Sequence, residues 1–168
     1  WGYYYGAMKN NTSLNLKSVA HKDDFVLIGP QGADASLALI DQCIALKIPY
    51  MFDPGFILTQ VTNQDLQRGL THAAYIIGNE YEMKLMRDRI TSVAKIIEDK
   101  IIITTFGKKG ATIDAKDVRH KIKCAPAKNV VDSSGAGDAW RGGFLAGMDK
   151  GFDLQTSGQM GAVASSFA

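Results

Sequence analysis

Short apolar runs alternate along this chain with stretches whose apolar residues recur at helical spacing. The runs that we predict to be strands cover residues 25–28, 48–52, 74–77 and 101–105. The first and last of them lack the alternation of a half-exposed strand, which indicates strands buried on both faces. A strand, a helix and a strand within about 30 residues form a βαβ unit. The sequence therefore predicts an α/β fold of three layers, with a mostly parallel sheet and helices on both faces.

The stretches between these runs predict helices. We expect helices over residues 34–46, 65–71, 80–87, 91–98, 135–148 and 154–167, and a hairpin of residues 111–113 and 121–123. Asp34 and Asn79 stand where a helix cap is expected, because their side-chain oxygens can accept hydrogen bonds from the first amides of a helix. In a sheet of this kind, ligands bind beyond the carboxyl ends of the strands. The loops that follow the strands are therefore the places to search for a site.

Composition excludes several classes of function. The 168 residues include 19 Lys and Arg and 17 Asp and Glu, a formal net charge of +2. This balance gives no electrostatic reason to expect a nucleic-acid partner or an anionic membrane surface, and no apolar run has the length of a bilayer span. Cys43 and Cys124 lie too far apart in sequence for a disulfide framework or a zinc pattern. We therefore expect a reducing compartment and a cytoplasmic protein.

The segment Asp132–Asp138 carries the strongest chemical signal. A small-residue loop with the pattern Gly135-x-Gly137 leads into an expected helix, whose first amides have no partner within the helix. Glycines let an anion approach the backbone, and the helix dipole favours negative charge there, so a phosphate suits this place. A plain turn in which Asp138 stabilises the helix start explains the same residues. The segment matches neither the Walker A pattern nor the dinucleotide fingerprint.

Three motifs, in order and each at the end of a strand, give the chain a family resemblance. Asp132–Asp138 resembles the D-T-x-G-A-G-D signature of the ribokinase-like (PfkB) carbohydrate kinases, with Ser133 in place of the usual Thr. Asn79–Glu82 matches the N-x-x-E of that family, and Thr105–Gly110 matches its T-x-G-x-x-G turn. The aromatic-Arg pair Trp140-Arg141 is similar to the bacterial adenosine-kinase-like branch. The resemblance covers nearly the whole chain.

The resemblance implies transfer of the γ-phosphoryl group of ATP to a substrate hydroxyl. It makes Asp138 the base that accepts the hydroxyl proton, in an anion hole formed by the amides of Gly135, Ala136, Gly137 and Asp138 itself. It places the nucleotide along Asn79, Thr105, Gly107, Lys108, Gly110 and Gly137, near Cys124 and the helix segment 161–166. It also gives Glu82 the task of positioning Mg²⁺ through water, and it leaves a monovalent cation such as K⁺ open at Asp132 and Ser134.

The same resemblance sets expectations about substrate and extent. The expected acceptor is a nucleoside or sugar, with adenosine first, while another sugar and a non-catalytic nucleotide-binding fragment stay open as alternatives. Residues 1–168 correspond to the C-terminal ATP-binding and catalytic part of a single ribokinase-like domain, without its N-terminal substrate and lid part. We therefore expect this fragment alone to be inactive. A homodimer of the full-length protein stays open.

Overall fold

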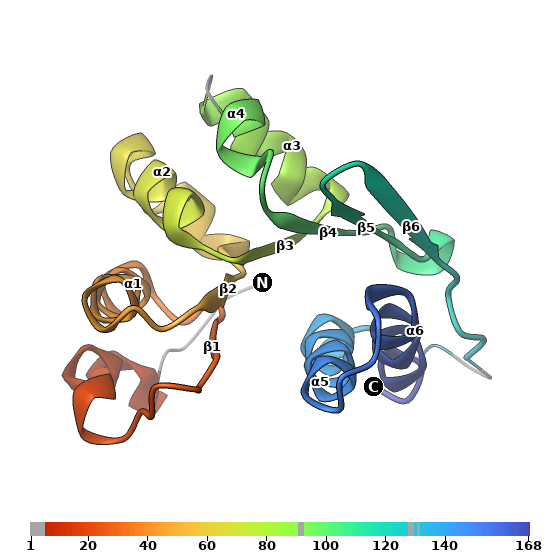
Figure 1. The fold of residues 1–168 in the computed structure, drawn as a ribbon, viewed down its shortest axis with the longest axis horizontal. Coiled ribbons are helices and arrows are strands. Elements are labelled where there is room, and N and C mark those ends of the chain that lie inside the picture. The colour runs from red at the N-terminus through yellow and green to blue at the C-terminus, as the bar shows by residue number, and fades with distance from the viewer. Residues whose placement is uncertain (1–5, 91–92, 128–129, 131) are drawn as a thin grey trace. The chain divides into compact units, whose positions relative to one another are not determined.

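The chain forms two compact units, residues 1–101 and 102–168, in the computed structural model of the protein. The residues that the structure describes are 6–90, 93–127, 130 and 132–168. Strands β1 to β3 belong to the first unit, and β4 begins at the boundary between the two. The second unit holds the rest of β4, the strands β5 and β6, and the last two helices (Figure 1).

The first unit is a parallel strand arrangement with its helices on one side. Strands β1 (Val26–Ile28), β2 (Tyr50–Phe52) and β3 (Tyr75–Asn79) pair in parallel, with Val26 opposite Tyr50 and Met51 opposite Tyr75. Its helices are α1 (Ala33–Leu46), α2 (Asn63–His72), α3 (Glu80–Arg89) and α4 (Val93–Ile97), with 3-10 turns η1 (Gly6–Ser13), η2 (Leu16–Ser18) and η3 (Gly55–Thr59). Helices α1 to α4 lie to one side of β1, β2 and β3 in Figure 1.

Strand β2 is the centre of the first core. Its three side chains, Tyr50, Met51 and Phe52, are each at most 1% exposed, which explains why this run shows no polar alternation. Helix α2 packs close above Phe52, because a side chain at Gly69 would lie only 3.0 Å from the Phe52 ring. Glycine at this position therefore sets the distance between the helix and the strand.

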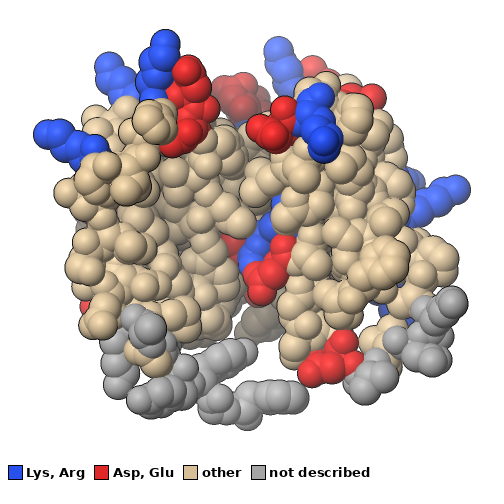
Figure 2. Space-filling view, turned by 90° about the horizontal axis from the view of Figure 1, so that it is seen from below, with Lys and Arg blue, Asp and Glu red and all other residues tan. Residues whose placement is uncertain are grey.

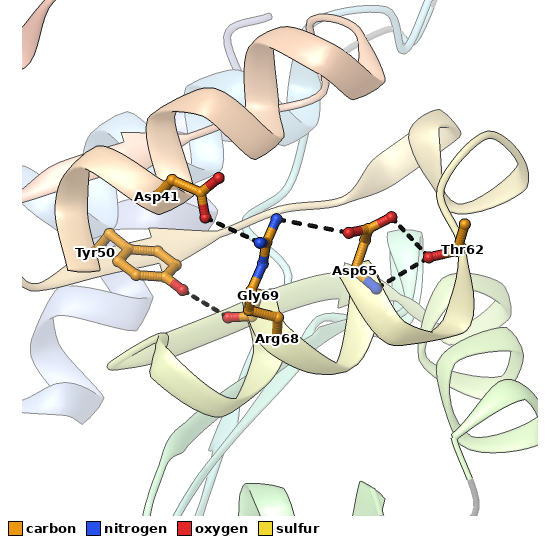
Figure 3. A network of polar contacts seen from close by, with 6 residues as sticks. All are labelled: Asp41, Tyr50, Thr62, Asp65, Arg68 and Gly69. Atoms are coloured by element: carbon orange, nitrogen blue, oxygen red, sulfur yellow. Dashed lines mark hydrogen bonds and ion pairs between the residues drawn. The ribbon is translucent and has the colours of Figure 1, made fainter. Parts of the chain in front are cut away.

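A polar network holds α1 and α2 together over β2 (Figure 3). The Arg68 guanidinium pairs with Asp41 of α1 at 3.2 Å and with Asp65 of its own helix at 3.5 Å. The buried Tyr50 hydroxyl donates to the Gly69 carbonyl at 2.7 Å, and burial raises the pKa of Tyr50. Since a buried hydroxyl without a partner is costly, this bond helps to fix α2 on the strand.

The second unit consists of a hairpin and a helix pair. Its elements are β4 (Ile101–Thr105), the 3-10 turn η4 (Gly107–Lys109), β5 (Ala111–Ala115), β6 (Val118–Ile122), α5 (Ala136–Asp149) and α6 (Leu154–Ser165). Strands β5 and β6 pair antiparallel, with Ala111 opposite Ile122. Helix α6 rests on this hairpin, because a side chain at Gly158 would meet the Ile122 Cδ1 atom at 2.6 Å.

Glycines bring α5 and α6 into close contact. A Cβ atom at Gly143 would lie 2.7 Å from the Met160 carbonyl oxygen, and one at Gly147 would lie 2.7 Å from the Ser157 hydroxyl. From the other side, a Cβ atom at Gly161 would lie 2.7 Å from the Trp140 carbonyl oxygen. Such spacing is tighter than any side chain allows, so the two helices pack backbone against backbone.

The structure confirms the predicted α/β fold and corrects two helix starts. Pairing is parallel among β1, β2 and β3 and antiparallel in the hairpin, so the strand set is mixed. The expectation that Asp34 caps the first helix was wrong: Gly32 stands at the cap position with φ 141°, and Asp34 lies in the first turn. Helix α2 begins at Asn63 instead of 65, because the Thr62 hydroxyl accepts the Asp65 amide hydrogen at 3.1 Å.

Candidate functional site

The loop before α5 is shaped by short backbone bonds. The Asp132 carboxylate accepts the Ser134 amide hydrogen at 2.8 Å, and this bond holds the pKa of Asp132 below its ordinary value. The chain then passes through Gly135 at φ 84°, a left-handed conformation that glycine adopts without strain. A Cβ atom at Gly135 or Gly137 would meet nothing within 4 Å. The space over this backbone is therefore open.

Helix α5 begins without a side-chain cap, although α6 in the same unit has one. In α6, Asp153 accepts the Thr156 amide hydrogen at 2.7 Å, whereas no side chain bonds to the first turn of α5. Of the four predicted anion-hole amides, that of Ala136 donates to the Ser133 carbonyl at 3.2 Å. Those of Gly135, Gly137 and Asp138 donate to none of the described residues. These donors and the helix dipole make the place suitable for an anion.

Asp138 lies in the first turn of α5 and is paired with Arg141. Its side chain is 76% exposed, whereas that of Arg141, one turn further along, is only 9% exposed. The pair joins the Arg141 Nη2 atom to the Asp138 Oδ1 atom. The candidate base is thus an exposed carboxylate held by a buried cation.

The turn that follows β4 is the second predicted site segment in this unit, and backbone hydrogen bonds shape it. The Phe106 amide donates to the Gly110 carbonyl at 2.8 Å, and the Gly110 amide donates to the Gly107 carbonyl at 2.9 Å. Gly110 has φ 91°, and a Cβ atom there would lie 2.1 Å from the Ile122 carbonyl oxygen. Only glycine fits at this position. Lys108 and Lys109 are exposed at the tip of the turn.

A cavity of about 120 Å³ joins these two segments within the second unit. It is lined by Thr105, Gly107, Gly110, Cys124, Ala136, Gly137, Trp140, Ala162 and Ser165. Five of these are predicted site residues, from the turn and from the start of α5. The cavity is smaller than the roughly 300–1,000 Å³ of sites that enclose a whole drug-sized ligand. It therefore suits part of a ligand that extends beyond it.

Trp140 lines the cavity, although the sequence predicted no ligand contact for it. The Trp140 ring stacks on Phe144 with 5.4 Å between ring centroids, as expected for a residue on the apolar stripe of α5. Ala162 reaches the cavity because α6 packs closely against α5 at Gly161. The helical spacing of Trp140 predicted a core position, and only the fold shows that the cavity lies against it. Cys124, Ala162 and Ser165, which were expected near the nucleotide, also line it.

Asn79 and Glu82 belong to the first unit, where they form a capping box at the start of α3. The Asn79 side chain accepts the Glu82 amide hydrogen at 2.9 Å, and the Glu82 Oε2 atom accepts the Asn79 amide hydrogen at 2.8 Å. This confirms Asn79 as the predicted cap. The Oε1 atom of Glu82 accepts no hydrogen bond from the described residues and keeps its capacity for another partner.

The described residues contain no cluster of three or more His, Cys, Asp or Glu side chains that could enclose a metal ion. A magnesium ion needs no such cluster, because it keeps several water ligands and takes one or two carboxylates. The residues present therefore fit a water-mediated Mg²⁺ contact at a single carboxylate such as Glu82.

The charge distribution follows the composition. On the face drawn in Figure 2, acidic and basic side chains are interspersed in a larger area of other residues. The described residues on that face therefore carry no broad patch of one sign, in keeping with the net charge of +2. Among the helices that the structure describes, none is long and apolar enough to cross a membrane.

Comparisons with known proteins agree with the motifs. A nucleoside kinase of Methanocaldococcus jannaschii is 34% identical over 118 residues, which is 69% of this chain and 39% of that protein. An adenosine kinase of Saccharomyces cerevisiae is 30% identical over 155 residues, 83% of this chain and 43% of that protein. The Burkholderia thailandensis nucleoside kinase in complex with inosine matches with a TM-score of 0.84 at 31% identity, over 95% of this chain and 53% of that one.

The chain thus spans about half the length, or less, of the relatives it matches. The match in structure nonetheless covers nearly all of its own residues, so the fold described above is the fold of these kinases. The family model for the pfkB family carbohydrate kinases matches residues 3–168. The chain belongs to the pfkB family of carbohydrate kinases, with a ribokinase-like fold.

Proposed function

We propose that the protein transfers the γ-phosphoryl group of ATP to a hydroxyl group of a nucleoside, with adenosine as the first candidate. The observation that carries this proposal is the start of α5, where Ala136 and Gly137 line a cavity and the exposed Asp138 stands in the same first turn. Relatives that are nucleoside and adenosine kinases, one of them in complex with inosine, support a purine nucleoside as the acceptor.

The amides of Gly135, Gly137 and Asp138 would stabilise the transferring phosphoryl group. Phosphoryl transfer passes through a loose transition state, so catalysis consists mainly of positioning and charge stabilisation. Backbone donors fixed at a helix start need no reorganisation when negative charge develops. The Ala136 amide is already used by the Ser133 carbonyl, so its part in the anion hole depends on that 3.2 Å bond opening.

Asp138 would accept the proton of the acceptor hydroxyl. Its carboxylate is exposed and therefore accessible to a substrate, and it stands in the same helix turn as the amide donors. In a loose transition state the hydroxyl proton leaves late, so a weak base in the right place is sufficient. Proton acceptance by Asp138 and anion stabilisation by the amides would then act on the two partners of one reaction.

The turn of residues 105–110 would hold the nucleotide beside these groups. Thr105, Gly107 and Gly110 line the cavity together with Gly137, which supports their assignment to one ligand. Lys108 is exposed and does not line the cavity, so its contact with the nucleotide requires the ligand to extend outside it.

We assign the reaction to the cytoplasm. Cys43 and Cys124 are free thiols, and a reducing compartment keeps thiols in this state.

Glu82 would position Mg²⁺ through water, and Asn79 would contact the phosphates. Bound Mg²⁺ neutralises phosphate charge. Glu82→Gln tests the role of the carboxylate, because glutamine preserves the capping box and removes only the charge. We expect a higher Mg²⁺ requirement for activity with nearly unchanged thermal stability, and an unchanged Mg²⁺ dependence would contradict the assignment.

A monovalent cation at Asp132 and Ser134 completes the proposal. The Asp132 Oδ1 atom already accepts the Ser134 amide hydrogen, so the cation would use the remaining oxygen atoms of these residues. Activity measured with K⁺ against a large organic cation at equal ionic strength tests this part alone.

The central experiment is ADP release from Mg-ATP by the full-length protein, with adenosine, inosine, cytidine and ribose as acceptors. We expect stimulation by adenosine and a loss of about 10²–10⁴-fold in kcat for Asp138→Asn, the usual contribution of a general base. Stimulation by another acceptor would replace adenosine as the proposed substrate and would still support phosphoryl transfer. ATP binding without turnover on any acceptor would overturn the proposal in favour of a non-catalytic nucleotide-binding protein.

A further inference from the structure

The pair of Arg141 and Asp138 is asymmetric in its exposure. The Arg141 side chain is 9% exposed, whereas the Asp138 side chain is 76% exposed. Residues three apart on a helix share a face, so the buried guanidinium can reach back to the first turn of α5. The pair of Arg119 and Asp114 on the hairpin differs, because there the arginine is the more exposed partner, at 65% against 28%.

Burying a guanidinium costs free energy, and an exposed carboxylate repays little of it through the ion pair alone. Burial lowers the pKa of Arg141, yet arginine stays charged at any ordinary pH. The pair with Asp138 by itself therefore contributes little to stability. What the guanidinium does supply is a fixed donor next to a carboxylate that would otherwise rotate freely in solvent.

The helix that carries Arg141 is itself held in place by α6. Its neighbour Trp140 stacks on Phe144 and touches the backbone of Gly161, where α6 lies against α5. One turn further, Gly143 packs against the Met160 carbonyl at a distance that no side chain allows. On this fixed helix, the buried Arg141 side chain has little room to move away from the first turn.

We propose that Arg141 is a positioning residue for Asp138, holding its carboxylate in one orientation beside the unbonded amides at the start of α5. This inference rests on the proposed function, in which Asp138 accepts the hydroxyl proton. Arg141 touches neither ATP nor the acceptor in this proposal. It acts only through the Asp138 Oδ1 atom, which leaves the other carboxylate oxygen for the substrate.

The test is a double-mutant cycle of Arg141→Met and Asp138→Asn, with kcat and KM measured for ATP and the acceptor. In the background of the natural Asp138, we expect Arg141→Met to lower kcat by about 10²-fold, the scale of a misplaced catalytic group, with both KM values unchanged. In the Asp138→Asn background, the same substitution should cause no further loss. Arg141→Lys should recover part of kcat, because it keeps the positive charge.

Thermal unfolding of each variant shows whether it is folded, and Arg141→Lys replaces Arg141→Met in the cycle if the latter does not fold. The matched control is Arg119→Met, which breaks the arginine–aspartate pair on the hairpin and should leave kcat unchanged. A second readout is independent of activity: Asp138→Asn should shift the guanidinium NMR resonances of Arg141 and not those of Arg119.

The outcomes separate the two proposals. If the natural protein phosphorylates no acceptor, the proposed function fails. If it is active and Arg141→Met keeps kcat, or lowers it equally in both Asp138 backgrounds, the positioning role is overturned and phosphoryl transfer stands. Unchanged Arg141 resonances in Asp138→Asn would overturn the pair itself.

Discussion

Helices α3 and α5 both begin at a predicted site, and they treat their first amides in opposite ways. In α3 the Asn79 side chain and the Glu82 side chain bond reciprocally to backbone amides. In α5 a left-handed glycine precedes the first turn and no side chain bonds to it. The first helix start bonds its amides with its own side chains, whereas the second leaves those of Gly135, Gly137 and Asp138 without an acceptor among the described residues. In this pair of helices, the polar cap therefore goes with stability, and the glycines go with open space over the backbone.

The largest expected effect is on unfolding free energy. It distinguishes a glycine that the backbone requires from a glycine with open space around it. Gly110→Ala would place a methyl group 2.1 Å from the Ile122 carbonyl oxygen at φ 91°, so we expect a loss of more than about 3 kcal/mol in unfolding free energy. Gly107→Ala is the matched control, with φ 56° and open space around it, and should cost only about 1 kcal/mol. Urea unfolding measures both, and equal losses would contradict the distinction.

Gly137→Ala tests whether the start of α5 is kept open for a ligand. Its methyl group meets nothing within 4 Å, and alanine favours the helix, so we expect stability to be retained or to rise by about 0.5–1 kcal/mol. The same methyl group would obstruct an anion approaching the amides, so kcat/KM should fall by about 10²-fold. Gly142→Ala, at an exposed position of the same helix, should leave kcat/KM unchanged. Full activity of Gly137→Ala would mean that these amides do not meet the ligand.

Asn79→Ala tests the other side of the comparison. Removing the cap leaves the Glu82 amide without its acceptor, so we expect a loss of about 1 kcal/mol in unfolding free energy. Asn79→Asp keeps a capping oxygen and should retain most of the stability. Denaturant unfolding followed by circular dichroism measures both, and the comparison fails if alanine and aspartate behave alike.

The smallest effect concerns pH and compares α6 with α3. The Thr156 amide holds the pKa of Asp153 below its ordinary value of 3.8, so Asp153 stabilises the folded state above that value and loses this contribution as the pH falls through the lowered pKa. Asp153→Asn keeps a cap without a titrating group, as Asn79 does for α3. Its stability relative to the natural protein should therefore rise as the pH drops below about 4. A constant difference across this range would contradict the role of the cap.

The sequence predicted those parts of the fold in which one local signal prevails. The β-branched run at 101–105 became β4 with the same bounds, and the stripe from Ala136 to Gly147 became α5. The start of α1 was predicted wrongly because Asp34 is a strong capping residue, yet a glycine with positive φ one residue before the helix took the cap position. The 3-10 turn η1 was not predicted, since its polar residues show no periodic pattern.

The site divides in a similar way. The glycine loop and the turn after β4 were recognisable because their chemistry lies in consecutive residues. The wall formed by Trp140 was not, because it depends on how closely α6 approaches α5. That approach is a tertiary property, and the glycines that permit it have no distinctive pattern of their own. The burial of Arg141 likewise could not be predicted from the sequence, because it depends on the packing of α5 in the folded protein.

The glycine contacts between α5 and α6 set the width of the cavity, because the absence of side chains at these positions lets the two helices approach closely. Gly143, Gly147 and Gly161 are not among the residues that line the cavity, yet a methyl group at any of them would push the two helices apart. Trp140 lies on one of these helices and Ala162 on the other, so the opposing walls would separate with them. Evolution can therefore enlarge or reshape this pocket without changing a single residue that meets the ligand.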